Sequence, residues 1–498
     1  MKDKTFYRLM EILPAMAAWT TLVLTVVFSI VLPTWVAVFI ILFDLYWMLK
    51  TVYLSLHMRS SFSAMRSNMK INWLARLKEN PNTAKRWEDI WHLVFLPIYN
   101  EPYEVVVETF HHLIEGNYPL DHFIIVLATE ERAGKQAQDV AQRIVEEFGN
   151  KFAHFIVTTH PANIVGELAG KGSNQAWAGK IVKEELIDKL NIPYNDIIVS
   201  VFDVDTQIYP QYFGVLTYTF LTSPKPLRSS YQPVPFFLNN IYQTPTLARI
   251  TAFSATFWHL TQQSRPEKLT TFSSHSMPFG ALAEIGFWQT DMVSEDSRVF
   301  WQCYMHYDGD WRTVPLAYPV SMDANVAPSF WQTMKNLYKQ QRRWGWGVEN
   351  VAFILSGFRK NKNIPRSKKW FWGFHVPEGF HSWATNSIIL FALGWMPVLL
   401  GGDAFRATLL AYNLPVVTQY IMTIASFGII TSAILSMFLL PPKPVGFKTV
   451  HKIWYLVSWI LMPATLIIFG AIPALEAQTR LALSGKWRLD FWVTPKHR

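Results

Sequence analysis

A long uncharged stretch near the N-terminus is the feature that most constrains this chain. Residues 12–43, between Glu11 and Asp44, carry no charge, and as a helix they would extend roughly 48 Å at about 1.5 Å per residue. One bilayer core is only about 30 Å thick. Because Pro33 interrupts the stretch, we predict a membrane hairpin with one span near 12–32 and a second near 34–55. A cleaved signal peptide is disfavoured, since a second apolar segment follows at once and no small-residue cleavage site precedes a polar start.

Basic residues flank this hairpin on both sides. They are Lys2, Lys4 and Arg8 before it, and Arg59, Arg66, Lys70, Arg76, Lys78, Lys85 and Arg86 after it. The positive-inside rule places both flanks in the cytoplasm. A basic surface beside anionic lipid accounts for most of the formal net charge of +9, so we expect membrane lipids, and not nucleic acid, as partners.

The composition agrees with a membrane protein. Charged residues make up 16% of the chain and hydrophobic residues 50%, whereas soluble domains average about 25% charged. A single cysteine, Cys303, excludes a disulfide framework and any multi-cysteine metal site. Three further spans are predicted by nearly uncharged stretches at 379–402, 404–442 and 453–475. Asp44 would lie inside the second span, either as a functional acid or as a bundle-facing acid at the interface near Lys50.

Residues 88–350 alternate apolar runs with helical patterns. Strands are predicted at 92–96, 123–127, 155–157 and 197–202, and helices at 102–116, 134–148 and 173–190. Buried strands separated by amphipathic helices form a parallel sheet with right-handed crossovers. Ligands of such sheets bind at the carboxyl ends of the strands, so the residues after each strand are the candidates for chemistry. Residues 224–290, rich in proline and aromatic side chains, give no assignment.

Two acids directly follow the fourth predicted strand. Asp203 and Asp205 are two positions apart, so both carboxylates can reach one hard divalent cation, Mg²⁺ or Mn²⁺, that bridges a diphosphate. The alternative is a pair of acids that caps the next helix. A second pair of this kind, within 308–310, surrounds a glycine without a preceding apolar strand and predicts a surface turn.

Two further clusters lie towards the end of this region. Ser294, Glu295 and Asp296 precede an expected helix, where acids commonly occupy the first turn. Residues 340–344 combine two arginines with a tryptophan; guanidinium groups hold phosphate with two hydrogen bonds, and an indole is a platform for a sugar ring. Each cluster alone is also explained by helix capping or by anchoring at the membrane interface.

In their order along the chain, these motifs resemble the membrane-bound, processive family-2 glycosyltransferases typified by cellulose and hyaluronan synthases. The matching segments are Pro97-Ile98-Tyr99-Asn100-Glu101, Lys171-Gly172-Ser173-Asn174, Asp203-Val204-Asp205, Ser294-Glu295-Asp296, Gln340 to Trp344, and Phe491-Trp492-Val493-Thr494-Pro495-Lys496. The last segment fits F-x-V-T-x-K, the gating-loop pattern of cellulose synthases. Each motif is weak alone, but six in family order over about 400 residues make a specific signal.

The resemblance implies an α/β GT-A (Rossmann-like) cytosolic glycosyltransferase domain inserted between α-helical transmembrane segments. The expected division is a transmembrane hairpin at 1–56, a basic interfacial segment at 57–90, the GT-A domain at 91–350, an interfacial amphipathic segment at 351–380, transmembrane helices at 381–475 and a cytosolic, gating-loop-like tail at 476–498. The implied location is a bacterial inner membrane.

The resemblance also implies a role for each matching residue. Asp203 and Asp205 would bind the metal. Asp296 would be the general base, Glu295 would shape its site, and Trp344 would bind the acceptor sugar. The nucleotide sugar would contact Pro97, Tyr99, Glu101, Glu130, Lys171, Gln340 and Arg343, and the gating loop would use Phe491, Val493, Thr494 and Lys496.

The implied reaction is the inverting, metal-dependent transfer of a hexose from a nucleotide-diphosphate sugar, with UDP favoured, to a growing polysaccharide that is translocated through the membrane. One base without a carboxylate nucleophile is typical of a single displacement. One alternative is a non-processive enzyme that adds one sugar to a lipid or glycolipid, although such relatives usually lack Q-x-x-R-W. Another is an inactive membrane scaffold or transporter, for which Asp203, Asp205 and Asp296 would have no use.

Two features depart from the family pattern. The family commonly has Asp-Asp-Gly after the second strand, where it contacts the nucleobase, whereas this chain has Ala128-Thr129-Glu130-Glu131. Glu130 is the expected substitute, and the nucleotide stays open. Three spans after Trp344 would also leave the C-terminus outside, although a gating loop must meet the nucleotide in the cytosol. We give precedence to the motif, because Pro415 and Pro463 interrupt the last two stretches, and either can hide an extra crossing or a re-entrant hairpin.

Overall fold

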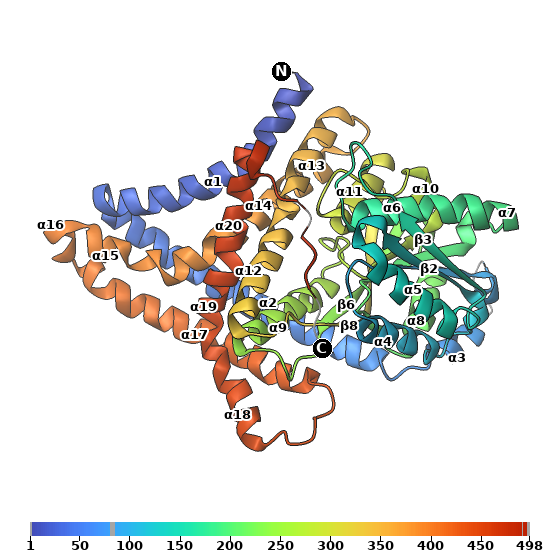
Figure 1. Cartoon of the computed structure of the whole chain (residues 1–498). Coiled ribbons are helices and arrows are strands. Elements are labelled where there is room, and N and C mark those ends of the chain that lie inside the picture. The colour runs from blue at the N-terminus through green and yellow to red at the C-terminus, as the bar shows by residue number, and fades with distance from the viewer. Residues whose placement is uncertain (1, 80–84, 491, 496–498) are drawn as a thin grey trace.

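The computed structural model describes residues 2–79, 85–490 and 492–495. An α/β unit on one side and a bundle of long helices on the other make up the molecule (Figure 1). The α/β unit contains an eight-stranded sheet with the strand order β3-β2-β1-β4-β7-β6-β8-β5. Its strands are β1 (Trp91–Pro97), β2 (Phe123–Glu130), β3 (His154–His160), β4 (Ile197–Val201), β5 (Gln207–Ile208), β6 (Ser229–Phe237), β7 (Ser276–Pro278) and β8 (Arg312–Met322).

The predicted parallel sheet is confirmed for the first four strands. β1 pairs in parallel with β2 and β4, and β2 with β3. The side chains of β1, β2 and β4 are buried on both faces because helices cover both sides: Phe110 of α4 and Ile144 of α5 pack in one core, and Ala176 of α6 and Val299 of α11 pack in the other. Continuous apolar runs are the pattern that such doubly covered strands produce.

The other half of the sheet comes from chain that the sequence pattern left unassigned. β7 is antiparallel to β4 and β6, β6 is parallel to β8, and β5 is antiparallel to β8. The pairing of β6 with β8 shifts register between Gln232 and Val234, beside Pro233, because a proline has no N–H for the ladder. This half brings Asp323, directly after β8, into contact with Asp205, which follows β4.

Eleven α-helices belong to the α/β unit or lie at its border with the bundle, within the described residues. They are α3 (Trp73–Lys78), α4 (Tyr103–Ile114), α5 (Gly134–Phe148), α6 (Lys171–Val182), α7 (Asp188–Leu190), α8 (Tyr212–Thr222), α9 (Thr246–Gln263), α10 (Phe279–Glu284), α11 (Glu295–His306), α12 (Phe330–Gly345) and α13 (Glu349–Lys360).

The bundle contains the apolar helices. They are α1 (Asp3–Val31), α2 (Pro33–Asn68), α14 (Arg366–Phe391), α15 (Met396–Leu400), α16 (Gly402–Arg406), α17 (Leu409–Leu439), α18 (Thr449–Val457), α19 (Met462–Thr465) and α20 (Ile472–Leu483). Within the described residues, four helices are long and apolar enough to cross a membrane: α1, α2, α17 and the continuous stretch Thr449–Leu483. A fifth is possible if α14 and the segment after it, bent by 51°, count as one span. Asp44 is buried in α2, so it faces the bundle.

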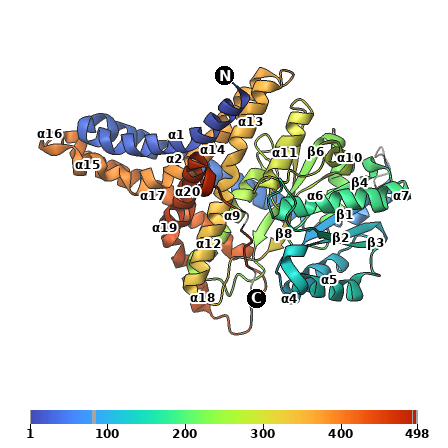
Figure 2. The same ribbon diagram turned by 45° about the horizontal axis from the view of Figure 1, so that its top comes forward.

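The stretch Thr449–Leu483 runs across α1, α2 and α17 instead of alongside them (Figures 1 and 2). Its contacts change along its length. Ser458 meets Arg249 of α9, Leu466 and Gln478 meet α14, and Thr479 accepts a hydrogen bond from Trp19 of α1. Near its end, Ala474 touches Gly345 of α12, where an added Cβ would come within 3.0 Å of the Ala474 Cα. The chain therefore leaves this stretch beside the α/β unit.

Candidate active site

Asp203 and Asp205 lie just past the carboxyl end of β4. The Asp203 carboxylate pairs with the Lys171 ammonium at 2.5 Å through Oδ1 and accepts a 2.8 Å hydrogen bond from the Ser273 hydroxyl through Oδ2. Asp205 is fully buried, and its Oδ2 accepts the backbone N–H of Asp323 at 2.9 Å. The structure thus places both acids where parallel sheets bind ligands, with Lys171 as the neighbouring cation.

Lys171 begins α6 and faces several carboxylates. Burial lowers the pKa of its ammonium, but the negative charges of Asp203, Glu295 and Asp296 outweigh this and hold the pKa above its usual value. Lys171 is therefore a fixed positive charge among acids from two separate segments. These electrostatic contacts bring Asp203 and the Glu295–Asp296 pair, almost a hundred residues apart in the sequence, into one charged cluster.

Gly172 allows this close approach. A Cβ at this position would lie 3.0 Å from the Glu295 Cβ and 3.1 Å from the Gln289 carbonyl oxygen. No larger residue fits there without displacing α6 from the start of α11. The glycine of the Lys171-Gly172 pair thus serves packing, and this packing sets the position of Lys171.

Glu295 and Asp296 form the first turn of α11. Glu295 is buried and Asp296 half-buried. Burial raises the pKa of both carboxyl groups, and the positive charges of Lys171 and Arg343 act in the opposite direction on both. The Asp296 Oδ1 accepts the Ser297 N–H at 2.8 Å. Asp296 is therefore a partly accessible carboxyl group whose proton affinity has been increased.

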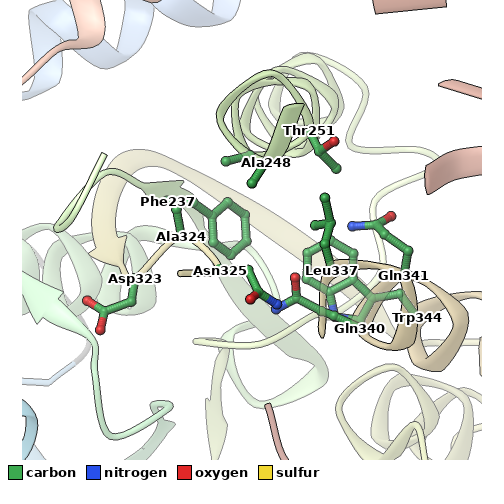
Figure 3. A pocket seen from close by; sticks show the side chains of 11 residues that line it. Phe237, Ala248, Thr251, Asp323, Ala324, Asn325, Leu337, Gln340, Gln341 and Trp344 are labelled. Carbon is green, nitrogen blue, oxygen red and sulfur yellow. The ribbon is translucent and has the colours of Figure 1, made fainter. Parts of the chain in front are cut away.

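A pocket lies between α9, α12, the end of β6 and the residues that follow β8 (Figure 3). Asp323, Gln340 and Trp344 line it together with Phe237 of β6. The Trp344 indole lies 5.9 Å from the Phe237 ring, between centroids. Because the Asp323 backbone also binds Asp205, one end of the pocket lies next to Asp205. Arg343, the neighbour of Trp344, acts electrostatically on both Glu295 and Asp296.

Four of the residues predicted to contact the nucleotide sugar form a separate group at the ends of β1 and β2. Pro97 ends β1, and the Tyr99 N–H donates to Glu101 at 2.8 Å. Glu130 is buried and paired with Arg132, whose guanidinium lies 4.5 Å from the centre of the Tyr99 ring. Arg132 therefore covers Glu130, and the exposed chemistry at this end is a guanidinium stacked on a phenol.

The C-terminal tail lies along α12. Lys339 packs 5.3 Å from the centre of the Trp492 ring, and Thr494 is buried. Leu489 packs with Val293 and Trp346. Val493 belongs to this described part of the tail, whereas Phe491 and Lys496 lie outside the described residues. The tail thus follows the helix that carries Gln340.

Several polar residues of the site carry no motif and were not predicted. They are Arg132, Ser273, Asp323 and Glu349. Asp323 follows β8 directly, so the rule that ligands bind after strands would have found it if β8 had been recognised. For the others the sequence offers no signal, because their partners lie far away in the chain.

The donor set at Asp203 and Asp205 fits a hard divalent cation. Within the described ranges no group of three or more His, Cys, Asp or Glu side chains is placed to hold a metal. Mg²⁺ is commonly bound by one or two carboxylates plus substrate phosphates, and not by an all-protein cage. Two carboxylates beside Lys171, which already attracts negative charge to this corner, match that arrangement.

No protein-family model matches the chain, and no curated protein matches its sequence. Among solved structures, the mannosyltransferase PcManGT from Pyrobaculum calidifontis, in complex with GDP-Man and Mn²⁺, is 13% identical, with a TM-score of 0.41, over 82% of this chain and 99% of that chain. S. aureus TarS residues 1–349 in complex with UDP-GlcNAc are 12% identical, with a TM-score of 0.32, over 70% of this chain and 91% of that chain. These are distant likenesses, and the function proposed below rests on the residues of the chain itself.

Proposed function

We propose that the protein is a membrane glycosyltransferase that moves a hexose from a nucleotide-diphosphate sugar, UDP being favoured, to the end of a growing polysaccharide. The main support for this proposal is the charged cluster formed by Lys171, Asp203, Glu295, Asp296 and Arg343. Lys171 pairs with Asp203 and attracts Glu295 and Asp296, and Arg343 acts on Asp296 from a fourth segment. Helix capping alone does not call for acids and cations from four segments to converge at the end of β4.

The cations of the cluster would bind the donor's leaving group. Cleavage of the bond between the anomeric carbon and the diphosphate leaves negative charge on the diphosphate, and positive groups positioned beforehand stabilise that charge. Lys171 is such a group, and Arg343 is a second one across the site. Mg²⁺ or Mn²⁺ held by Asp203 and Asp205 would add Lewis-acid stabilisation of the same leaving group.

Asp296 would accept the proton of the acceptor hydroxyl. Its carboxyl group is half-buried and its pKa is raised mainly by burial, which makes the carboxylate a stronger base than an exposed aspartate. The acceptor oxygen would form its bond to the anomeric carbon on the face opposite the departing diphosphate. A single displacement of this kind inverts the configuration. Glu295, buried behind Asp296, would shape the site.

Trp344 would be the platform for the acceptor sugar. The pocket places its indole opposite Phe237, with Gln340 beside it and Asp323 at the end near Asp205. The free volume of this pocket is about 10 Å³, close to that of one water molecule, so a sugar would stack on the indole once the neighbouring side chains move aside. It would then present a hydroxyl towards the charged cluster. This position supports processive addition, because the newly added sugar would become the next one held by the indole.

The bundle supports insertion into a membrane. α1, α2 and α17 expose large apolar side chains, including Val31, Trp35, Leu56, Tyr412 and Phe427, as surfaces facing lipid do. Polar groups face inwards instead: Thr21 hydrogen-bonds His381 at 2.9 Å, and Thr385 and Asn386 are buried.

We propose that four segments cross the membrane: α1, α2, α14 with α15, and α17. Thr449–Leu483 would lie at the cytosolic interface, because it runs across α1, α2 and α17, and Glu476 within it contacts Tyr338 and Arg342 of α12. Arg480, one turn further on, donates to the same Glu476 carboxylate. Two crossings before the GT-A domain at 91–350 and two after it leave the tail at 476–498 in the cytosol. This resolves the conflict between the hydropathy count and the gating-loop motif.

A panel of radiolabelled UDP- and GDP-sugars, incubated with membranes containing the full chain, tests the proposal. We expect one donor to give a product of many sugars. A product of one added sugar on a lipid would favour the non-processive alternative, and no transfer from any donor would favour an inactive scaffold or transporter. The matched control is the same membrane with Asp203→Asn.

A further inference from the structure

A second cavity lies away from the proposed active site, between the first turns of α1 and the end of α13. Its volume is about 200 Å³, and Asp3, Lys4, Tyr7, Ser356, Arg359 and Lys360 line it. None of these residues belongs to the charged cluster or to the pocket beside Trp344. The start of α1 and α13 lie next to each other where the bundle meets the α/β unit (Figure 1).

The lining of this cavity has an excess of positive charge. Lys4, Arg359 and Lys360 supply cations, and Asp3 is the one acid among the lining residues. The Lys360 ammonium lies 3.2 Å and the Arg359 guanidinium 3.9 Å from the Asp3 carboxylate. The lining therefore carries three basic side chains and one carboxylate. An anion with several oxygens, such as a phosphate group, would balance the positive charge of this lining, since arginine binds phosphate with two parallel hydrogen bonds.

Ser356 adds a neutral donor to the same wall. Its hydroxyl oxygen is buried and forms no hydrogen bond within the described part of the chain. A buried hydroxyl without a partner is destabilising, and a bound acceptor removes that cost. The cavity therefore combines cationic groups at its mouth with an unused hydroxyl in its wall, and both suit a phosphate oxygen.

The cavity also lies at the level expected for lipid headgroups. Along α1 the exposed apolar surface begins two residues after Tyr7, at Leu9, and continues to Val31. On α14, which follows α13, Trp370 and Phe374 are 79% and 64% exposed. Exposed aromatic side chains next to an apolar surface are typical of the membrane interface. A phosphate reaching this cavity from the bilayer would need no change in the fold.

We propose that this cavity is a binding site for the phosphate of an anionic phospholipid headgroup, held by Arg359 and Lys360 with Lys4 and Ser356. A phospholipid headgroup and free inorganic phosphate both present a phosphate anion to such a cavity. The place of the cavity at the membrane interface favours the lipid. The site rests on the membrane position of α1 and does not depend on sugar transfer.

Binding is tested on the full chain purified in a neutral detergent, with lipid retention measured by native mass spectrometry. We expect phosphatidylglycerol to be retained at a concentration where phosphatidylcholine is not, since only the former carries a net negative charge. Arg359→Gln with Lys360→Gln should weaken retention on the order of tenfold or more, because each basic residue near an anionic headgroup contributes substantially to binding. Lys4→Gln, a milder change, should weaken it less.

The control is Lys180→Gln with Lys189→Gln, which removes two exposed cations from α6 and α7 at the far end of the α/β unit. Equal retention of both lipids, or an equal loss in the control, would overturn the site. If the double variant does not fold, the same criteria apply to Lys4→Gln. Millimolar inorganic phosphate should leave the lipid bound. If it displaces the lipid as effectively as soluble phosphatidylglycerol does, the site belongs to free phosphate and the lipid assignment is wrong.

Discussion

The carboxylate of Glu349 holds the turn of Ser294. Glu349, the first residue of α13, accepts the Ser294 hydroxyl at 2.7 Å and the backbone N–H groups of Val293 and Ser294 through Oε1. Its Oε2 accepts the indole N–H of Trp346 at 3.1 Å. One buried side chain therefore fixes the turn before Glu295 and Asp296 to the segment that follows Trp344.

Replacement of Glu349 by glutamine should loosen this connection. A glutamine has one acceptor oxygen, so its amide N–H₂ must face either the Trp346 indole N–H or the N–H groups of the Ser294 turn. Donors then face donors in a buried place, which costs about 1–3 kcal/mol. We expect a lower melting temperature and slower transfer, with donor binding nearly unchanged. Glu147→Gln, which alters an exposed carboxylate bound to Tyr103, is the control. A Glu349→Gln protein as stable and as active as the parent would contradict this role.

Asp296→Asn tests the general base directly. Asparagine keeps the shape of the side chain but cannot accept a proton, so transfer should fall by about 10²- to 10⁴-fold. Donor binding, measured by calorimetry, should persist because Lys171 and Arg343 remain. Asp310→Asn changes an exposed acid that pairs with Lys225 in a turn and should leave transfer unchanged. Retained turnover in Asp296→Asn would eliminate this residue as the base.

The pH profile should respond to Arg343. Burial raises the pKa of Asp296, and the Arg343 charge lowers it. The carboxylate form is the active base, so kcat/KM should increase with pH through a midpoint above the usual aspartate value of about 3.9. Arg343→Gln removes the opposing charge, and the midpoint should move to higher pH. Lys335→Gln removes an exposed cation from the same helix and should not move it. A shift to lower pH in Arg343→Gln would refute the proposed electrostatic contact.

Removal of divalent cations should stop transfer. Asp203 and Asp205 offer hard oxygen donors at the end of β4, a set suited to Mg²⁺ or Mn²⁺ together with a diphosphate. EDTA should abolish product formation, and added Mn²⁺ or Mg²⁺ should restore it. Asp205→Asn should raise the concentration of metal needed for half-maximal activity. Full activity in EDTA would show that Lys171 and Arg343 suffice for the leaving group.

The sequence predicts one half of the sheet well and the other half poorly, for a physical reason. β1, β2 and β4 are buried on both faces, so their residues form continuous apolar runs. β6 and β8 instead contain Pro233, Pro235, Pro315 and Pro319, which interrupt the strand pattern, and their pairing absorbs a register shift. Asp323 was not predicted as a site residue because β8 was not predicted. The rule that ligands bind after strands applies only to strands that have been recognised.

Hydropathy likewise could not decide how Thr449–Leu483 lies. A helix that spans a bilayer and one that lies along its surface can be equally long and apolar. The surface orientation that we propose rests on packing: Glu476 accepts hydrogen bonds from Tyr338 and Arg342, both at 2.6 Å. These partners stand 134 or more positions away in the chain. Contacts between residues so far apart in the chain determine how the helix is oriented, and no local sequence pattern predicts such contacts. The order of the motifs, in contrast, predicted Lys171, Asp203, Asp296 and Arg343 as site residues. The structure brings these four into one charged cluster.

Trp344 offers the sharpest test of processivity. Its indole lines the pocket opposite Phe237. A sugar ring stacks on the flat face of an indole, and alanine has no such face. Trp344→Ala should therefore release the growing chain early and shorten the product, while the affinity for the donor changes little. Trp331→Ala, which removes a 79% exposed indole from the other end of the same helix, is the matched control. Product length is measured by gel electrophoresis of radiolabelled polymer at equal turnover. Unchanged length in Trp344→Ala would remove the acceptor role of this residue, and an equal shortening in the control would assign the effect to α12 as a whole.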